Sequence, residues 1–299
     1  MSRYYSTIGW AVFVVGSISL AFYGLTHGWG VAPSMLVQGV LTYIVCGVAE
    51  VVVPYRRDWM WLSDREVVTD VGHVILFDQS INYLYAIATV MVADYVLPAA
   101  ASDMPVMIVL GVMYLEISEY WRHRYLHGSD TFWPLHAIHH HLDRMHIFRS
   151  GRVHFVDGMA RVVFTFVPAL LLGVPTTAIL CWMILLTATG PISHSNLNIY
   201  TPKSLNILLV TPMVHRLHHA SVDAHMRSNL APLSPLVDLL FDTWLDPENN
   251  PVAEVGVVPD VVPTGFLGQL TFPFIGILRR LGLYSVEGGT KQVPNGPND

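Results

Sequence analysis

The apolar residues of this chain gather into long stretches separated by short polar segments. Four stretches cover residues 8–25, 31–53, 74–97 and 106–120, and the last continues as a helix through His127. Each approaches the roughly 20 residues that a helix needs to cross the hydrocarbon layer. A fifth stretch, residues 162–189, is interrupted at Gly173 and Pro175, which predicts a hairpin of short helices. We therefore expect an all-α, polytopic membrane helix bundle with about four transmembrane helices and a re-entrant hairpin.

The remaining segments are shorter and less regular. Residues 190–247 are mixed and Pro-rich, so we expect short helices folded against the membrane face as a histidine-rich cap. Residues 264–283 are apolar and contain Arg279 and Arg280, a pattern typical of an interfacial helix, and the tail from residue 287 has a disordered composition. The stretch 8–25 lacks a small-residue cleavage site, which indicates a retained helix. We predict an N-terminal transmembrane hairpin (1–60), a central domain (61–246) and a C-terminal interfacial segment with a flexible tail (247–299).

Composition and charge agree with a membrane protein. Hydrophobic residues make up 53% of the 299 residues and charged residues only 13%, whereas a soluble domain carries roughly a quarter charged residues. The loops 26–30 and 98–105, which join predicted spans on one side of the membrane, contain no Lys or Arg. All 16 basic residues therefore fall on the other predicted side. Positive charge marks the cytoplasmic side. The net charge of −6 and the dispersed basic residues exclude a nucleic-acid-binding surface.

Cysteine and histidine usage narrows the chemistry. Cys46 and Cys181 are the only cysteines and both lie in apolar stretches, which excludes a disulfide framework and a cysteine-ligated metal cluster. Histidine is abundant instead, with 15 residues, and all of them except His27 and His73 lie between positions 123 and 225. That concentration predicts a function for the histidines.

The clustered histidines are spaced as metal ligands on helices. An i, i+4 pair and two HxxHH patterns each place imidazoles on one helical face, with the adjacent histidine about 100° away. We predict nine ligands on the cytoplasmic face of the membrane: His123, His127, His136, His139, His140, His194, His215, His218 and His219. Imidazole nitrogen suits iron, zinc, copper and nickel, so the pattern leaves the metal open.

Other polar residues are candidates for supporting these ligands, because a metal-bound imidazole usually donates its second N–H to a carboxylate or carbonyl. Glu119 and Glu116 lie one and two turns before His123. Weaker candidates are Asp223, Asn229 and Asp238. We interpret the histidines that fit no ligand spacing as structural or solvated, namely His27, His73, His141, His146 and His225.

At residues 119–127, 132–140 and 211–219 the chain resembles the three histidine boxes of the fatty acid hydroxylase and sterol desaturase superfamily. His194 with Ser195 and Asn196 precedes the third box as in many members. The resemblance covers residues 70–244, and Arg152, His154 and Asp157 look like an element between the boxes. Phe155 replaces the usual proline and Asp157 the usual glutamate, while Asn229 and Asp238 match a later motif only loosely. His154, Glu119, Asp157 and Asn229 are therefore possible site residues.

The resemblance implies a membrane enzyme in which two iron ions use O2 to oxidise an unactivated C–H bond of a lipid. Residues 61–246 would form the catalytic domain. The chain has no Gly-rich dinucleotide fingerprint, cysteine cluster or haem domain, so a ferredoxin, cytochrome or reductase is expected to supply two electrons. Hydroxylation and desaturation stay open, as do the fatty acyl, sterol, carotenoid and ornithine-lipid substrates.

Three other classes compete with this interpretation. A histidine-rich metal transporter or metal-binding protein would need polar residues inside the spans to form a pathway for the ion. Asp78 and Asp94 are the only acidic residues in the third span, which is few for such a pathway. A b-type cytochrome needs histidine pairs on facing helices inside the bilayer, but these histidines are predicted outside it. A zinc hydrolase usually has three protein ligands and a water, and nine histidines are too many.

Overall fold

A computed structural model describes residues 3–79, 104–257 and 262–280, and these residues form an all-helical fold. Within these ranges there is no β-strand, and only two isolated bridges join Pro54 to Leu197 and Ala220 to Val255. The predicted all-α class is therefore confirmed for the described residues.

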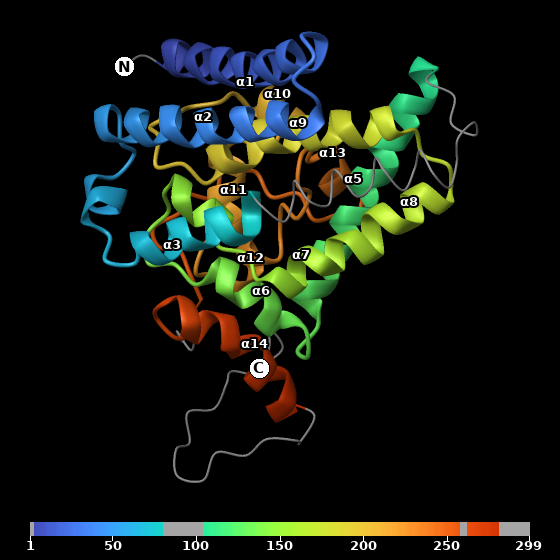
Figure 1. The fold of residues 1–299 in the computed structure, drawn as a ribbon. Coiled ribbons are helices and arrows are strands. Elements are labelled where there is room, and N and C mark those ends of the chain that lie inside the picture. The colour runs from blue at the N-terminus through green and yellow to red at the C-terminus, as the bar shows by residue number, and fades with distance from the viewer. Residues whose placement is uncertain (1–2, 80–103, 258–261, 281–299) are drawn as a thin grey trace, which may run out of the picture.

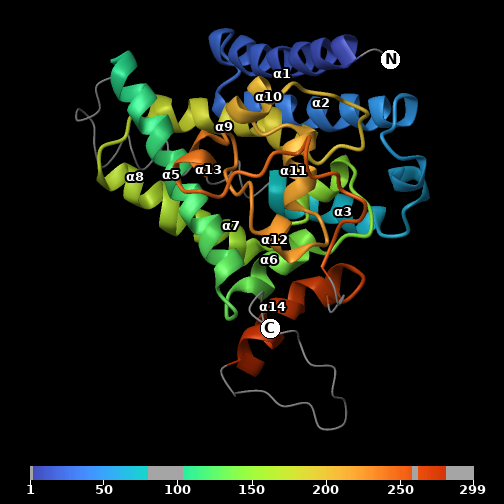
Figure 2. The same ribbon diagram turned by 180° about the vertical axis from the view of Figure 1, so that it is seen from behind.

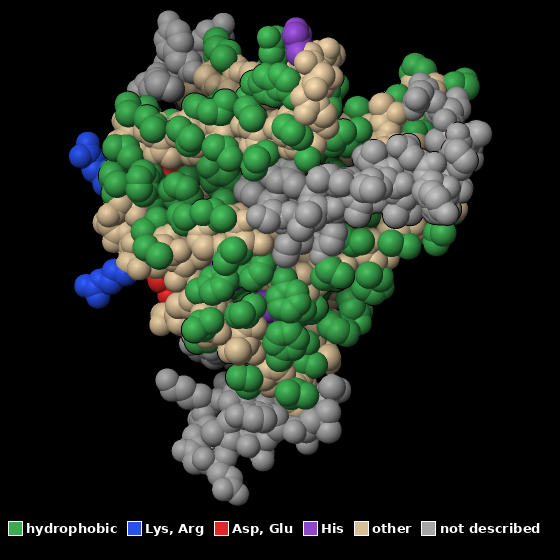
Figure 3. Space-filling view, in the orientation of Figure 1, with side chains coloured by type: hydrophobic (Ala, Val, Ile, Leu, Met, Phe, Trp, Pro, Cys, Tyr) green, Lys and Arg blue, Asp and Glu red, His purple; other side chains and the backbone are tan. Residues whose placement is uncertain are grey.

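Three long apolar helices form one side of the molecule (Figure 1): α1 (Arg3–Thr26), α2 (Val31–Val52) and α9 (Thr176–Ser193). Their segments Ser6–Thr26, Val31–Val52 and Thr176–Ser193 are long and apolar enough to cross a membrane. Hydrophobic side chains cover the α1 and α2 face in Figure 3. Gln38 donates to the carbonyl of Ile184 at 3.0 Å, which ties α2 to α9 inside this layer.

A second set of helices crosses beside this layer: α5 (Pro105–Gly128), α7 (Phe155–Arg161), the π-helix η5 (Val162–Phe166) and α8 (Val167–Leu171). The chain turns between α8 and α9 at Gly173, whose φ of 74° suits glycine. The interruption predicted inside residues 162–189 therefore exists. The α1–α2 loop, the start of α5 and the α8–α9 turn lie at the same end of the molecule (Figures 1 and 2).

The predicted spans agree only in part with the structure. Residues 8–25 and 31–53 correspond to α1 and α2, and the end of the fifth stretch corresponds to α9. The stretch 106–120 lies in α5, which is long enough but interrupted by Glu116, Glu119 and Arg122, so α5 is not among the three candidate spans. Of the stretch 74–97, the described residues contain only the π-helix η3 (Val74–Gln79); the rest lies outside them.

Short helices make up most of the rest of the molecule. They are η1 (Arg57–Trp59), η2 (Trp61–Ser63), α3 (Val67–His73), α6 (Trp133–His140), η4 (Ile147–Gly151), α10 (Lys203–Leu208), α11 (Pro212–His218), α12 (Asp223–Met226) and α13 (Leu236–Leu240). One of them, α10, lies beside α1 (Figure 2). Short helices after α9 were predicted. α6 and α11 each have a proline in the first turn, where its missing N–H leaves no intrahelical bond unmade.

The C-terminal helix α14 (Phe266–Arg280) packs on α3 and α6. Gln269 hydrogen-bonds His73 Nε2 at 3.1 Å, and Gly276 lies against Pro134. Leu267 and Phe274 point away from these contacts and are exposed. The helix exists as predicted, its interfacial position stays a prediction, and the tail predicted to be disordered lies outside the described residues.

Gly111 permits a close approach between α5 and α9. A Cβ at Gly111 would lie 2.7 Å from Ala178 Cβ and 2.8 Å from Val174 Cγ1, whereas nothing lies within 4 Å of a Cβ at Gly16 in α1. We predict that Gly111→Val lowers the midpoint of thermal unfolding in detergent, because overpacking costs about 1–3 kcal/mol. Gly16→Val is the matched control, and equal midpoints for the two variants would contradict this packing.

Candidate metal centre

All nine predicted histidines come together at the centre of the described structure, in two neighbouring groups. The five-histidine group contains His123, His127, His136, His140 and His218, and the four-histidine group contains His139, His194, His215 and His219. Within each group the candidate ligand atoms lie within 4.8 Å of one another. The two groups touch, because the rings of His140 and His219 stack with centroids 4.3 Å apart.

The two HxxHH patterns each contribute to both groups. On α6, His136 and His140 face one group while His139 faces the other. On α11, His218 belongs to the five-histidine group, and His215 and the C-cap residue His219 belong to the other. This division follows from the 100° step between helical neighbours. Each short helix therefore joins the two groups.

The remaining ligand candidates come from the ends of two long helices. His123 and His127 occupy the last two turns of α5, and His194 is the C-cap of α9. Helix α11 is fixed at its start by Thr211, whose side chain accepts a hydrogen bond from the backbone N–H of Val214. The candidate ligands thus belong to helices that are themselves held in place.

Five pairs of Nε2 atoms in the two groups lie within 3.2 Å of each other. These distances are 3.0 Å for His123–His136, 3.2 Å for His123–His127, 3.1 Å for His139–His194, 2.9 Å for His194–His215 and 3.1 Å for His215–His219. Nitrogens bonded to one metal at about 2.1 Å are about 3.0 to 3.4 Å apart. The lone pairs of neighbouring rings can therefore converge on one ion.

Several imidazole nitrogens in the two groups are buried without a hydrogen-bond partner among the described residues. His218 Nε2 and both ring nitrogens of His140 are examples. Buried polar atoms in native proteins are nearly always satisfied, so such a concentration requires an explanation. Metal coordination by His218 and His140 would satisfy one nitrogen of each, and the residues present therefore fit a metal.

Hydrogen bonds at Nδ1 set the orientation of four of the nine rings. His136 Nδ1 lies 3.1 Å from Asp157 Oδ2. Backbone carbonyls accept the other three bonds: Leu230 from His123 at 2.7 Å, Ser228 from His218 at 2.9 Å and Gly190 from His194 at 3.0 Å. An imidazole that donates from Nδ1 presents the lone pair of Nε2, which is the form that binds a metal.

Burial lowers the pKa of several of the clustered imidazoles. It lowers the pKa of His194 to about 4, and it lowers the pKa of His218 to about 3 with an added contribution from the neighbouring His136. The pKa of His139 and that of His140 also lie well below the usual value, because of burial first and the neighbouring histidines second. These nitrogens therefore have free lone pairs at neutral pH, as metal ligands require.

A buried chain of charges supports the five-histidine group. Asp157 bonds both His136 and Arg122, Arg122 forms a two-pronged ion pair with Glu119, and Glu119 also pairs with Arg161 at 2.8 Å. Burial by itself would raise the pKa of Asp157, but the charge of Arg122 and the hydrogen bond with His136 outweigh it and hold that pKa well below its usual range. Asp157 is thus an anion that contacts a ligand candidate directly.

A cavity of about 160 Å³ adjoins both groups. His123 and His136 line it from one group, and His139, His194 and His215 line it from the other. Apolar side chains also line it, namely Met35 from α2, Phe166 from η5, and Trp182, Met183 and Leu186 from α9, together with charged residues such as Arg122 and Asp157. A hydrophobic molecule in this cavity would lie against the imidazoles of both groups.

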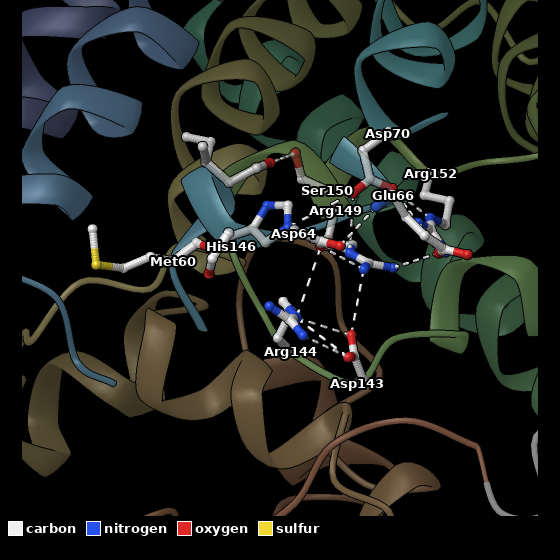
Figure 4. A network of polar contacts seen from close by, with 12 residues as sticks. Met60, Asp64, Glu66, Asp70, Asp143, Arg144, His146, Arg149, Ser150 and Arg152 are labelled. Atoms are coloured by element: carbon white, nitrogen blue, oxygen red, sulfur yellow. Dashed lines mark hydrogen bonds and ion pairs between the residues drawn. The ribbon is translucent and has the colours of Figure 1, made fainter. Parts of the chain in front are cut away.

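The described residues contain a third group with metal-ligand chemistry, Asp64, Asp70 and His146 (Figure 4). Its carboxylates already face guanidinium groups, since Arg149 bonds Asp64 at 2.6 Å and Asp70 at 3.0 Å, and Arg152 bonds Asp70. These cations occupy the carboxylate oxygens, so we assign this group a structural role. His146 is therefore buried and structural, in agreement with its interpretation from the sequence.

This network (Figure 4) holds the end of α6. Arg149 and Arg152 both donate to the carbonyl of His141, the C-cap of that helix, at 3.3 and 3.0 Å. His141 directly follows His139 and His140 in the sequence. The buried ion pairs therefore anchor the segment that bears three of the clustered histidines.

Residues 108–243 match the sequence model of the family described as Fatty acid hydroxylase. The ornithine lipid hydroxylase OlsE of Rhizobium tropici is 30% identical over 246 residues, which cover 78% of this chain and 73% of that relative. This chain belongs to the fatty acid hydroxylase family. No solved structure matches it. The resemblance inferred from the histidine boxes is thereby confirmed, and the chain is a lipid hydroxylase of the membrane.

The structure places the other candidates of this hydroxylase at different distances from the histidines. Glu119 and Asp157 line the cavity. Asn229 lies between Ser228 and Leu230, whose backbone carbonyls accept hydrogen bonds from His218 and His123. His154 bonds the carbonyl of Leu270 in α14 and belongs to neither group. Asp223 forms an exposed ion pair with Arg227.

Sequence reasoning missed several supports of the hydroxylase site. Arg122 and Arg161 complete the buried charge chain. The i, i+3 spacing of Glu119 and Arg122 could have indicated their ion pair from the sequence. The carbonyls of Gly190, Ser228 and Leu230 have no signal in the sequence, because every residue has a carbonyl. Only the folded backbone shows which of them face an imidazole.

We predict that Asp157→Asn weakens metal binding by the hydroxylase about 10–100-fold, because His136 loses an anionic acceptor. Competition with a chromophoric chelator would measure this affinity. Asp223→Asn is the matched control, since Asp223 pairs only with Arg227 among the ion pairs of the described residues. An Asp157→Asn protein with the affinity of the control would contradict the role assigned to this carboxylate.

Proposed function

We propose that this chain is a membrane-bound di-iron oxygenase that hydroxylates an unactivated C–H bond of a lipid. The observation that carries the proposal is the pair of nitrogen-only groups beside one cavity that apolar side chains partly line. The nine histidines would be the metal ligands, five for one ion and four for the other. Iron would supply the redox chemistry that activates O2 there.

The donor atoms and the family together favour iron. Neutral imidazole nitrogen suits iron, zinc, copper and nickel, and membership of the fatty acid hydroxylase family favours iron among them. Magnesium and calcium prefer oxygen ligands, which neither group contains.

The chain's own residues would bind the lipid and exclude water from the site. The apolar lining residues of the cavity come from α2, η5 and α9, and α2 and α9 contain candidate membrane spans. A lipid carbon chain would enter along these apolar residues and lie against the histidines. Asp157 and Arg122 would hold His136 in its orientation while the substrate binds.

The proposed reaction inserts one oxygen atom of O2 into a C–H bond and reduces the other to water, and it consumes two electrons and two protons. A separate ferredoxin, cytochrome or reductase would donate the electrons, because the sequence contains no dinucleotide fingerprint and no cysteine cluster. The similarity to an ornithine lipid hydroxylase favours an acylated amino-acid lipid over a sterol, and hydroxylation over desaturation. The metal transporter stays the alternative function.

The arrangement in the membrane is part of the proposal. Residues 1–60 would form a transmembrane hairpin, 61–246 the catalytic domain and 247–299 an interfacial segment with its tail. Lys and Arg side chains project from one edge of the molecule in Figure 3, away from the end that contains the α1–α2 loop and the α8–α9 turn. By the positive-inside rule, the histidine cluster would lie on the cytoplasmic side.

The proposed reaction predicts incorporation of labelled oxygen. Purified protein with iron, ornithine lipid in mixed micelles, and a ferredoxin with its reductase and NADPH should yield a hydroxylated lipid whose new oxygen comes from isotopically labelled O2. Mass spectrometry of the lipid would measure this. Label entering from water instead, or no product from any lipid tested, would contradict the proposal. Turnover with NADPH alone would exclude the separate electron donor.

The division into two groups predicts that each group can lose its metal separately. We expect His139→Ala and His218→Ala each to reduce bound iron from two ions to about one and to abolish hydroxylation, because the two residues belong to different groups. Both variants should still fold in membranes. His225→Ala, outside both groups, is the control. Iron content and activity equal to the control would show that the ligand assignment is wrong.

A further inference from the structure

The segment formed by Ser228, Asn229, Leu230 and Ala231, here called the backbone bracket, contacts two ligand candidates at once. The carbonyl of Leu230 accepts from His123 Nδ1 at 2.7 Å, and the carbonyl of Ser228 accepts from His218 Nδ1 at 2.9 Å. We propose that this bracket sets the orientation of the five-histidine group, and that Asp238 is the positioning residue that holds it. The inference rests on the proposed function.

The two histidines come from helices that are far apart in the sequence. His123 lies on α5 and His218 on α11, and both belong to the five-histidine group. The four-histidine group has no bond to the bracket among the described residues, since His194 donates to Gly190 instead. The bracket therefore acts on one of the two groups.

Each of the two accepting carbonyls belongs to a peptide unit that is also held at its other end. A peptide unit is planar, with its C=O and N–H pointing in opposite directions, so a bond to the N–H fixes the direction of the C=O. The N–H of Ala231 donates to Asp238 at 3.1 Å, and the C=O of the same unit belongs to Leu230 and faces His123. Asp238 therefore directs this carbonyl toward the imidazole.

The second peptide unit is held in a similar way. The N–H of Asn229 donates to the carbonyl of Thr243 at 2.9 Å, and the C=O of that unit belongs to Ser228 and faces His218. Thr243 donates to Asp238 twice, both at 2.8 Å: its N–H bonds the backbone carbonyl of Asp238, and its hydroxyl bonds the carboxylate. Asp238 thus fixes one carbonyl directly and the other through Thr243.

The hydrogen bonds of the Asp238 carboxylate among the described residues all serve the bracket or Thr243. It is fully buried at the third position of α13, beside α5 (Figure 2), and also accepts from the N–H of Leu230 at 2.7 Å. An aspartate so buried is costly unless hydrogen-bonded, and its bonds all lead to the bracket or to Thr243. Its position is explained by holding the bracket.

Asn229 supports the same conformation. Its φ of 53° is in the left-handed region, which asparagine tolerates better than most residues. Its side-chain amide donates to the carbonyl of Leu245 at 3.0 Å and accepts from the N–H of Leu245 at 2.9 Å. The side chain therefore fixes the turn that separates the two accepting carbonyls.

The matched control is Glu116, which binds the same loop three residues further on. It accepts from the backbone N–H groups of Leu233 and Ser234 at 2.9 and 2.7 Å, as Asp238 does from Leu230 and Ala231. Leu233 and Ser234 have no hydrogen bond to a histidine in the described part of the chain. Glu116→Gln should therefore disturb the loop without changing the orientation of a ligand candidate.

The test compares Asp238→Asn with Glu116→Gln in the full chain, loaded with the Mössbauer isotope of iron. In wild type two iron environments are expected. In Asp238→Asn we expect one environment to change and its affinity for iron, measured against a chelator, to fall about 10–100-fold, while the other is unchanged. Glu116→Gln should retain both environments, even if its thermal stability falls as much.

Other results would overturn the inference. An Asp238→Asn protein with both wild-type environments would show that the bracket does not position the ligands, and equal changes in both would indicate general destabilisation. If Asp238→Asn does not fold, Asn229→Gly replaces it, because glycine retains the positive φ while removing the bonds to Leu245, and it should change the same single environment. A wild-type protein without iron would instead refute the proposed function.

Discussion

The packing of nine imidazoles against one another is the constraint on which the structure depends. Seven of the rings are buried, and an unsatisfied buried polar group costs about 1–3 kcal/mol. His218 Nε2 and both nitrogens of His140 are unsatisfied within the described chain. A protein sustains such a cluster when a metal binds the free lone pairs, and this requirement explains the long helices, the short helices and the charged networks around it.

The surrounding structure holds short helices that would be unstable alone. Helices α6 and α11 have eight and seven residues, fewer than an isolated helix needs, yet they contribute five of the nine histidines, and the C-cap of α11 contributes a sixth. Buried ions fix α6: Arg149 and Arg152 bind the end of the helix, and Asp157 binds His136. The charges inside this membrane hydroxylase therefore stabilise ligand geometry, and the apolar helices α2 and α9 supply the cavity.

The sequence predicted the histidine groups because helical periodicity determines which residues share a face. The spacing at 123 and 127 and the two HxxHH patterns were sufficient for this, and His194 followed from its place after the hairpin. It also predicted the break near Gly173. It could not predict that Leu230 and Ser228 provide acceptors, since carbonyls have no residue signature. The span expected in α5 contains Glu116, Glu119 and Arg122. The two carboxylates are tolerated because each has partners: Trp182 and two backbone N–H groups donate to Glu116, and Arg161 donates to Glu119.

X-ray absorption spectroscopy of the iron-loaded protein tests the central claim most directly, because it reports the atoms bound to the metal. The account predicts two irons per chain, each bound by nitrogen from four to five imidazoles on average, with a second iron nearby and no sulfur ligand. One metal per chain, or a first coordination shell dominated by oxygen or sulfur, would contradict the assignment of all nine histidines to a dinuclear centre.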